Sequence, residues 1–542
     1  MPANLEKILA DDQFLYGRNG DWRSYWEDLA DFCLPRRAWI NSIRSKGERL
    51  KFNFLYNSEA IRDSKICASG FHSRITNPSS KWFTMQTRDV DLMESREVRD
   101  WFSRTEKKMY AVLNASNFDN VIQEFYMSSI VFGTGVILIL RDYKYKVRFT
   151  FIPIEQLNLA ENCYEIVDQV YRTFRFTAAQ AIEMWGDKAG KSVKETYPNK
   201  PYEEMDFLHY VGPREIRDYA KEDYMNMQFE SIWIAKKDKH LIEERGFKEN
   251  PYVTGRFWKD ANDVFGFSPS MDVFADVKTI NAQAKTALRR AMKETDPPIQ
   301  VPESGYVMPL NFNPSAINYR KRGVDADALA AIGVGAGNFQ ITQEMMNMTI
   351  KAIQDGYYVP LFSALGDVTK EMTVPEVQKR IADSMSLLGP AVGRHTTEVL
   401  TPLLTRVFNI LYETGEIPPI PAALQGREMD FIFLGELVKA QKQSEMNPIQ
   451  SFLQLIGGIQ QALPESQIAD NVDTDVIPDI IGKILTVDPR LIRDEKQVQE
   501  IRQARAKAQQ QAQQLEQIHM ASEAARNAAD AHKAGKEAEA VK

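Results

Sequence analysis

The stretch Ser268–Val301, SPSMDVFADVKTINAQAKTALRRAMKETDPPIQV, decides how the rest of the chain is interpreted. Its first residues predict a helix start, because the Ser268 hydroxyl can accept from free N–H groups of a first turn and Pro269 fits that turn. Apolar residues then recur at helical steps: Phe274, Val277, Ile280, Ala284, Ala287, Leu288 and Ala291. Asp296-Pro297-Pro298 ends the helix, since proline lacks the amide donor. At ~1.5 Å per residue this helix would be about 40 Å long, so we expect it to pack beside other helices.

Another face of this predicted helix is basic. It carries Lys278, Lys285, Arg289 and Lys293. The ordinary interpretation of such a stripe is a solvated face or one that pairs with acidic side chains. The stripe would become functional if several copies of the helix were arranged in a ring.

The composition is that of an ordinary globular protein. The chain has 542 residues, of which 44% are hydrophobic and 26% charged, enough for several structural units with more than one core. The formal net charge of -7 argues against a protein that wraps nucleic acid with a uniformly basic surface. It is compatible with a nucleic acid that slides past the protein.

Cysteine usage and targeting features favour a reducing compartment. Cys33, Cys67 and Cys163 lie far apart and match no disulfide or metal spacing. The N-terminal residues lack the basic region and apolar core of a secretion signal. The most apolar run, Ile130–Leu140, is too short to span a bilayer. We therefore expect a soluble cytoplasmic protein with no membrane partner.

The N-terminal half combines helical and strand patterns. Helical spacing predicts helices over Leu5–Leu34, Ser58–Ile75, Val98–Leu113, Val121–Val131 and Thr177–Trp185. Strands are predicted over Tyr143–Phe151, Tyr164–Phe176 and Met227–Ala235. This order predicts an α+β fold, mainly helical, with an antiparallel sheet rather than the βαβ rhythm of a nucleotide-binding fold.

The C-terminal half is predicted to be largely helical. Ile341–Tyr357 has helical spacing, and Val374–Tyr412 is a long helical region that two internal prolines should kink. Glu428–Leu434 is predicted to be a strand. From Glu495 to Lys542, alanine, glutamine and charged residues predict an exposed helix that needs identical neighbours to gain stability.

No motif of an enzyme or a metal site is well matched. Gly186–Ser192, GDKAGKS, has one residue too few for a phosphate-binding loop, and a predicted helix rather than a strand leads into it. Gly333, Gly335 and Gly337 lack the strand and the final glycine of a dinucleotide fingerprint. The aspartates of Asp470–Asp479 match no EF-hand spacing, and the six histidines have no metal spacing. We predict no catalytic residue, no cofactor and no metal.

The order of elements resembles that of the portal proteins, the head-to-tail connectors of short-tailed, double-stranded DNA bacteriophages. Six short segments carry the resemblance: Asp276–Asn281, Asp296–Pro298, Met372–Val377, Leu388–Arg394, Thr401–Leu404 and Leu437–Lys442. Each segment alone has low specificity, but the ordered set extends over nearly the whole chain.

The resemblance implies a ring, typically a dodecamer, at one vertex of the capsid. Its parts would be a wing (1–267 and 374–420), a stem (268–296 and 341–365), a clip (297–340), a tunnel loop (366–373), a crown (421–494) and a C-terminal helical barrel (495–542). The ring would form the channel for DNA packaging and ejection, and it would dock the packaging motor and then the tail.

The same resemblance implies the partners and the DNA-facing residues. The partners would be double-stranded DNA, capsid protein and scaffold, the terminase motor, a tail adaptor and internal core proteins, with the ring assembled in the host cytoplasm and located in the virion. Lys370 and Glu371 of the tunnel loop are expected near DNA. The basic stripe of Lys278, Lys285, Arg289 and Lys293 would line the channel if it faces the axis; it could equally face tail proteins or neighbouring subunits.

Two other functions are open at this point. One is a DNA-packaging ATPase or another DNA-processing enzyme that uses Gly186–Ser192 as its phosphate site. The other is a tail adaptor or an internal virion protein, which should form thin rings or none. A channel that conducts DNA should avoid tight phosphate binding, since each neutralised phosphate adds affinity and therefore friction. An acidic chain with sparse basic positions suits such a channel.

Overall fold

The structure of the protein, a computed structural model, describes a defined set of residues. These are residues 5–41, 53–89, 92–93, 95–221, 223–295, 299–300, 330–331, 339–363, 388–434, 449, 451–459, 472, 476–477, 481, 498–508, 510–511, 520, 522–523 and 526–527. The chain divides into two units. The first comprises Met1–Arg88, Arg104–Ile420 and Gly426–Ala440, and the second comprises Asp89–Ser103, Pro421–Gln425 and Gln441–Lys542.

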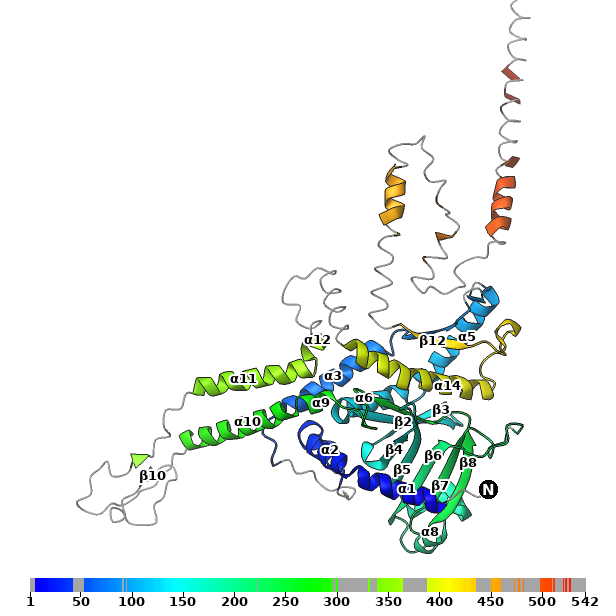
Figure 1. Ribbon diagram of the computed structural model, residues 1–542. Helices are drawn as coiled ribbons and strands as arrows, with labels where there is room; N and C mark the ends of the chain where they lie inside the picture. The colour runs from blue at the N-terminus through cyan, green and yellow to red at the C-terminus, as the bar shows by residue number, and fades with distance from the viewer. Residues whose placement is uncertain are drawn as a thin grey trace, which may run out of the picture. The chain divides into compact units, whose positions relative to one another are not determined.

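A five-stranded antiparallel sheet is the largest β element of the first unit (Figure 1). Its order is β4 (Leu157–Glu161), β5 (Val167–Thr177), β6 (Glu204–Pro213), β7 (Phe229–Ala235) and β8 (His240–Phe247). Strands that neighbour one another in the sequence also neighbour one another in the sheet. Short connections between successive strands produce this meander.

Both faces of this sheet are covered, because adjacent residues of a strand point to opposite sides. On one face Phe207 packs with Trp185 of helix α7 (Ala178–Trp185). On the other face Leu208 packs with Ile8 and Leu15 of helix α1 (Leu5–Arg18). The Thr177 hydroxyl accepts from the Gln180 amide and the Gln180 side chain accepts from the Thr177 amide, which forms a capping box at the start of α7.

A three-stranded antiparallel sheet lies against helix α6 (Phe118–Phe132). Its order is β3 (Lys146–Ile152), β2 (Thr134–Asp142) and β9 (Tyr252–Arg256). Ten residues of α6 are buried, so this helix lies at the centre of the first unit. Gly133 ends α6 in a left-handed conformation with φ of 78° and leads directly into β2.

The remaining elements of the first unit are mostly helices. They are α2 (Gly20–Cys33), α3 (Glu59–Ile75), α9 (Pro269–Asp272), α10 (Phe274–Thr295), α11 (Phe339–Gly356), α12 (Val359–Ser363), a π-helix at Thr396–Leu400, α14 (Thr401–Glu413) and the 3₁₀ turns Pro35–Arg37, Ile154–Gln156 and Gly186–Lys188, with α8 at Lys191–Thr196. Two strand pairs complete it, β1 (Phe83–Thr87) with β12 (Met429–Phe433) and β10 (Ile299–Gln300) with β11 (Ala330–Ala331). Helix α5 spans Arg96–Ala115. In the second unit, residues 451–459 and 498–508 are helical, and Ala422–Leu424 forms a 3₁₀ turn.

The structure confirms the α+β class and the antiparallel sheets, and it corrects several boundaries. The helix predicted over Leu5–Leu34 is two helices that meet at Asn19. The strand predicted from Tyr143 begins at Lys146, because Tyr143–Tyr145 forms the turn between β2 and β3. The alternation of polar and apolar residues continues through that turn, so spacing alone could not locate it. Strands β1, β2, β4, β6, β8 and β9 and the two-residue strands β10 and β11 had not been predicted.

The stretch Ser268–Val301 also differs in one respect from the prediction. Its helix is broken at Val273 into α9 and α10. Helix α11 ends at Gly356, and Tyr358 has a left-handed φ of 57° before α12 begins. The predicted clip is described only at residues 299–300, 330–331 and 339–340, and the tunnel loop with Lys370 and Glu371 lies outside the described residues. So do Gly333, Gly335, Gly337 and most of Asp470–Asp479.

Two buried histidines contact aromatic rings and hydroxyl groups. The His209 ring stacks on Trp233 with 3.7 Å between centroids, and its nitrogens contact the Tyr252 and Ser231 hydroxyls at 2.6 and 2.9 Å. His395 lies 3.2 Å from the Tyr126 hydroxyl. Burial lowers the pKa of His209 well below its ordinary value and that of His395 to about 3.

Acid should therefore destabilise the fold in part through these two histidines. Below a pH of about 6.5 the unfolded chain binds a proton at His395, but the folded chain does not bind it until about pH 3. The free energy of unfolding therefore decreases as the pH is lowered from about 6.5 to about 3. Between pH 7 and pH 5 the loss due to His395 should be about 2 kcal/mol. Urea unfolding at both pH values should show that His395→Gln, which cannot titrate, loses less stability than the wild type by this amount. An equal loss in both proteins would contradict the assignment.

Candidate functional site

The base of the α10–α11 helix pair is fixed by a chain of buried hydroxyl groups. The Ser268 hydroxyl accepts from the Met271 amide at 3.1 Å, as the sequence predicted, and donates to the Val131 carbonyl at 2.9 Å. The Ser270 hydroxyl contacts the Ile130 carbonyl at 2.9 Å and the Tyr357 hydroxyl at 2.7 Å. These bonds join the start of α9 and the end of α11 to the C-terminal turn of α6.

Beyond this base the two helices lie side by side (Figure 1) and expose apolar side chains. The buried residues of α10 are Phe274, Val277 and Ile280, all in its first two turns. Further along, Leu288 and Met292 are 45% and 58% exposed, and Met348 on α11 is 71% exposed. A single copy of the chain therefore leaves part of the predicted apolar face uncovered.

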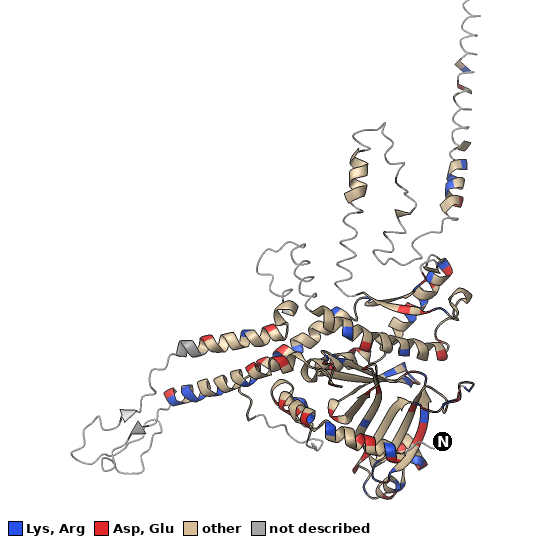
Figure 2. Ribbon diagram, in the orientation of Figure 1, with Lys and Arg blue, Asp and Glu red and all other residues tan. Residues whose placement is uncertain are grey.

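Basic residues recur along α10 (Figure 2), and their contacts divide the basic stripe into two parts. Lys278 contacts Asp28 of α2 at 3.0 Å, and the Lys285 ammonium lies 5.4 Å from the centre of the Tyr56 ring. Both therefore have partners in the same chain. Arg289 and Lys293, in the last two turns of α10, are exposed.

The segment that resembles a phosphate-binding loop is already occupied by a carboxylate. Helix α8 begins after Gly190, and the Ser192 amide donates to Asp238 at 2.7 Å, while the Ser192 hydroxyl bonds the other oxygen of the same carboxylate. Lys191 is 87% exposed and lies 3.8 Å from Glu195. An anion at this helix start would have to displace Asp238, so the geometry supports the turn interpretation.

The part of the chain that the structure describes contains no group of three or more histidine, cysteine, aspartate or glutamate side chains that could hold a metal ion. Within the same residues, no helix is both long and apolar enough to cross a membrane.

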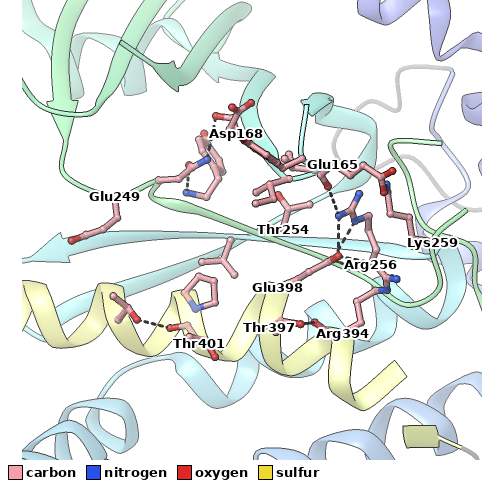
Figure 3. A pocket seen from close by; sticks show the side chains of 18 of the residues that line it. Glu165, Asp168, Glu249, Thr254, Arg256, Lys259, Arg394, Thr397, Glu398 and Thr401 are labelled. Atoms are coloured by element: carbon pink, nitrogen blue, oxygen red, sulfur yellow. Dashed lines mark hydrogen bonds and ion pairs between the residues drawn. The ribbon is translucent and has the colours of Figure 1, made fainter. Parts of the chain in front are cut away.

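The sequence did not predict a pocket beside β9 (Figure 3). It has a volume of about 660 Å³ and lies between β9, the hairpin that joins β4 to β5, and the helical residues Arg394–Thr405. Tyr164, Ile166 and Phe229 contribute apolar surface, and Tyr164 and Ile166 are 79% and 59% exposed. No spacing pattern signals such a pocket, because its walls come from three distant parts of the sequence.

A buried ion cluster closes one end of this pocket (Figure 3). Arg256 bonds both oxygens of Glu398, at 3.2 and 2.9 Å, and also bonds Glu161. The Arg256 side chain is 4% exposed. Burial by itself lowers the pKa of Arg256, but the bonds and charges of Glu398 and Glu161 raise it above its ordinary value. Glu398 lies on the π-helix Thr396–Leu400, a type of turn that is frequent at functional sites.

Gly255 allows β9 to approach this π-helix closely. A Cβ atom at Gly255 would lie 2.2 Å from a methyl group of Val399. The Arg256 amide donates to Glu398 at 3.0 Å, so the π-helix satisfies one outward-facing group of β9.

Comparison with known proteins identifies the family. Residues 7–492 match the family model described as bacteriophage head to tail connecting protein. The chain is 27% identical over 501 residues to a probable portal protein of Bordetella phage BPP-1, covering 90% of this chain and 89% of the relative. It is 29% identical over 515 residues to the portal protein of Salmonella phage epsilon15, covering 93% and 92%.

A solved structure of the neck of an empty GTA particle aligns over 73% of this chain and 87% of its own at 10% identity, with a TM-score of 0.33, too low to support any inference. The family model matches most of the sequence. The chain therefore belongs to the family of bacteriophage head to tail connecting proteins.

Proposed function

We propose that this protein is a bacteriophage portal, whose copies form a ring-shaped channel at one vertex of the capsid. The observation that carries the proposal is the family match over residues 7–492, together with two relatives named as portal proteins that align over most of the chain. DNA would be packaged and ejected through the channel, and the packaging motor and then the tail would dock on the ring. Family membership points to a structural connector rather than an enzyme.

The exposed apolar side chains of α10 and α11 support a ring. Repetition of one head-to-tail contact closes into a ring when the rotation between copies is an integral fraction of a turn. In such a ring the helix pair of each copy would be the stem, and neighbouring stems would cover Leu288, Met292 and Met348, which are exposed in one copy. The wing, clip, crown and barrel assignments, and a dodecameric copy number, belong to the same proposal.

The DNA-facing residues are proposed on the same basis. Lys370 and Glu371 would lie near DNA in the tunnel loop. Within the basic stripe, Arg289 and Lys293 are better candidates than Lys278 and Lys285, because the latter two have partners in their own chain. The capsid protein, scaffold, terminase motor, tail adaptor and internal core proteins remain the expected partners.

A charged substitution on the stem should test the ring directly. Met348→Glu should leave the stability of the single chain unchanged, because the side chain is 71% exposed. It should lower the yield of rings at least about tenfold, since the ring would bury an unpaired carboxylate. The matched control is Asn347→Glu, the adjacent exposed polar position. Light scattering after size exclusion measures both; rings of Met348→Glu at wild-type yield would contradict the stem assignment.

The ATPase alternative has its own test. We expect the purified protein to hydrolyse no ATP, and Lys191→Ala to change neither this result nor ring formation, because the Asp238 carboxylate already accepts from the amide and the hydroxyl of Ser192 at the start of α8. Steady ATP turnover that Lys191→Ala abolishes would establish the enzyme instead. A phosphate-release assay on rings of both proteins decides between the two.

A further inference from the structure

The outer edge of β9 has unsatisfied hydrogen-bonding groups that face the pocket. The Ile139 amide donates to Pro251, and the Phe257 amide donates to Gly133, both at 2.9 Å. In an antiparallel pair such bonded positions alternate with positions whose N–H and C=O groups point away. Thr254 therefore directs its amide and carbonyl away from β2, toward the pocket that it lines.

The neighbouring outward amides are already satisfied by side chains. The Tyr252 amide donates to Asn250 at 2.9 Å, and the Arg256 amide donates to Glu398 at 3.0 Å. Among the hydrogen bonds of the described residues none satisfies the Thr254 amide, and the buried Thr254 hydroxyl oxygen has no partner either. A buried hydroxyl is rarely left in this state, and the amide faces the pocket, so the Thr254 position is suited to a partner that arrives from outside.

Asp168, which also lines the pocket, has an unpartnered side-chain oxygen as well. Its buried Oδ1 atom has no hydrogen-bond partner, and burial raises the pKa of Asp168 above its ordinary value. The three basic residues that line the pocket are all engaged with carboxylates: Arg256 with Glu161 and Glu398, Lys259 with Glu165, and Arg394 with Glu398. An occupant with an apolar body and a cation would satisfy the apolar lining and Asp168 together.

The tip of the β2–β3 hairpin offers such a group. Tyr143 is the most exposed large hydrophobic side chain of the described residues, and Lys144 beside it is exposed. The tip is held in shape, because the Asp142 carboxylate accepts from the amides of Lys144 and Tyr145 at 2.7 and 2.9 Å and Lys146 adopts a left-handed φ of 67°. A preorganised tip loses little entropy on binding.

We propose that the hairpin tip Asp142–Lys146 of one copy docks in the β9 pocket of a second copy of this chain in the ring. Tyr143 enters the apolar part of the pocket, and Lys144 faces Asp168. A pocket of about 660 Å³ lies in the range that encloses drug-sized ligands and has room for these two side chains. The loop between β6 and β7 also exposes an aromatic residue, Tyr219, but residues 214–228 carry four acidic and three basic side chains, whereas residues 142–146 carry one acidic and two basic ones, so this loop complements Asp168 less well.

This inference rests on the proposed function, since it requires a ring. Disulfide cross-linking in assembled rings tests it. In a Cys163→Ser background, which removes the exposed native cysteine, Tyr143→Cys is combined with Ile166→Cys at the pocket rim. Mild oxidation should yield a ladder of linked subunits on a denaturing gel. The matched control combines Tyr219→Cys with Ile166→Cys and should give at least about tenfold less linked product, because effective concentration is high only for sites held together.

A second measurement uses the unmodified protein. Hydrogen exchange in wild-type rings should show a protected Thr254 amide, because the docked tip would exclude water and the Tyr143 hydroxyl can accept from this amide, which has no partner among the described residues of a single copy. Two results would overturn the docking and leave the portal proposal intact. One is rapid exchange of the Thr254 amide in the rings, and the other is a yield of cross-linked product from the control pair equal to that from the Tyr143 pair. A wild-type protein that forms no rings would overturn both.

Discussion

Arg256→Ala should lower the free energy of unfolding by about 3–5 kcal/mol, because it removes one partner from a buried ion cluster. Arg256 bonds Glu398 and Glu161 and also donates to the backbone carbonyls of Glu165 and Val264, so one side chain joins β9, the β4–β5 hairpin and the π-helix. Alanine would leave both carboxylates without this cation in surroundings where they are 18% and 13% exposed. Glu398 would keep Arg394 and Glu161 would keep Lys259 at 3.6 Å, so the loss comes from buried carboxylates that are only partly compensated, together with the two backbone carbonyls that lose their donor.

Arg394→Ala is the control for this prediction. Arg394 contacts the same Glu398 carboxylate at 3.0 Å, but its side chain is 35% exposed and it contributes to one ion pair at helical spacing. Such a pair contributes less than about 1 kcal/mol. Urea unfolding followed by tryptophan fluorescence measures both variants. A small effect of Arg256→Ala, comparable to that of Arg394→Ala, would show that the cluster does not hold these elements together.

Gly133→Ala should lower the free energy of unfolding by more than about 3 kcal/mol, for two physical reasons that act together. Gly133 has a φ of 78°, which side chains disfavour. A Cβ atom there would also lie 1.9 Å from the Gly266 carbonyl oxygen, a backbone atom that cannot rotate away. The clash would push the start of β2 away from the segment that leads into α9, at the base of the helix pair.

Gly415→Ala separates these two causes. Gly415 has nearly the same φ, 70°, but nothing lies within 4 Å of its hypothetical Cβ atom. Gly415→Ala should lower the free energy of unfolding by only about 1 kcal/mol, the cost of a side chain at this positive φ. Thermal and urea unfolding of the two variants give the comparison, and equal losses would mean that the contact with Gly266 contributes nothing.

Local sequence signals predicted those helices that begin with a capping residue. Ser268 forms the predicted cap, and Thr177 begins α7 as expected. The signals failed where structure depends on tertiary contact. The break at Val273 has no breaker residue, and Tyr143–Tyr145 continues the alternation of the strand that follows it, so neither position could be recognised from spacing.

The pocket shows why a site can escape sequence reasoning altogether. Arg256 and Glu398 are 142 residues apart, and neither belongs to a motif. The unsatisfied groups of Thr254 follow from the pairing of β9 with β2, and strand β9 itself was not predicted. The family, by contrast, could be recognised from an ordered set of short segments, and the family match over residues 7–492 confirms it.

Electron microscopy of the purified wild-type protein in negative stain, with the symmetry counted from top views, tests the portal proposal most directly. The proposal predicts closed dodecameric rings with a central channel, and side views that show a stalk formed by the α10–α11 pairs. Thin rings without a stalk, or particles that remain single chains at every concentration, would contradict it.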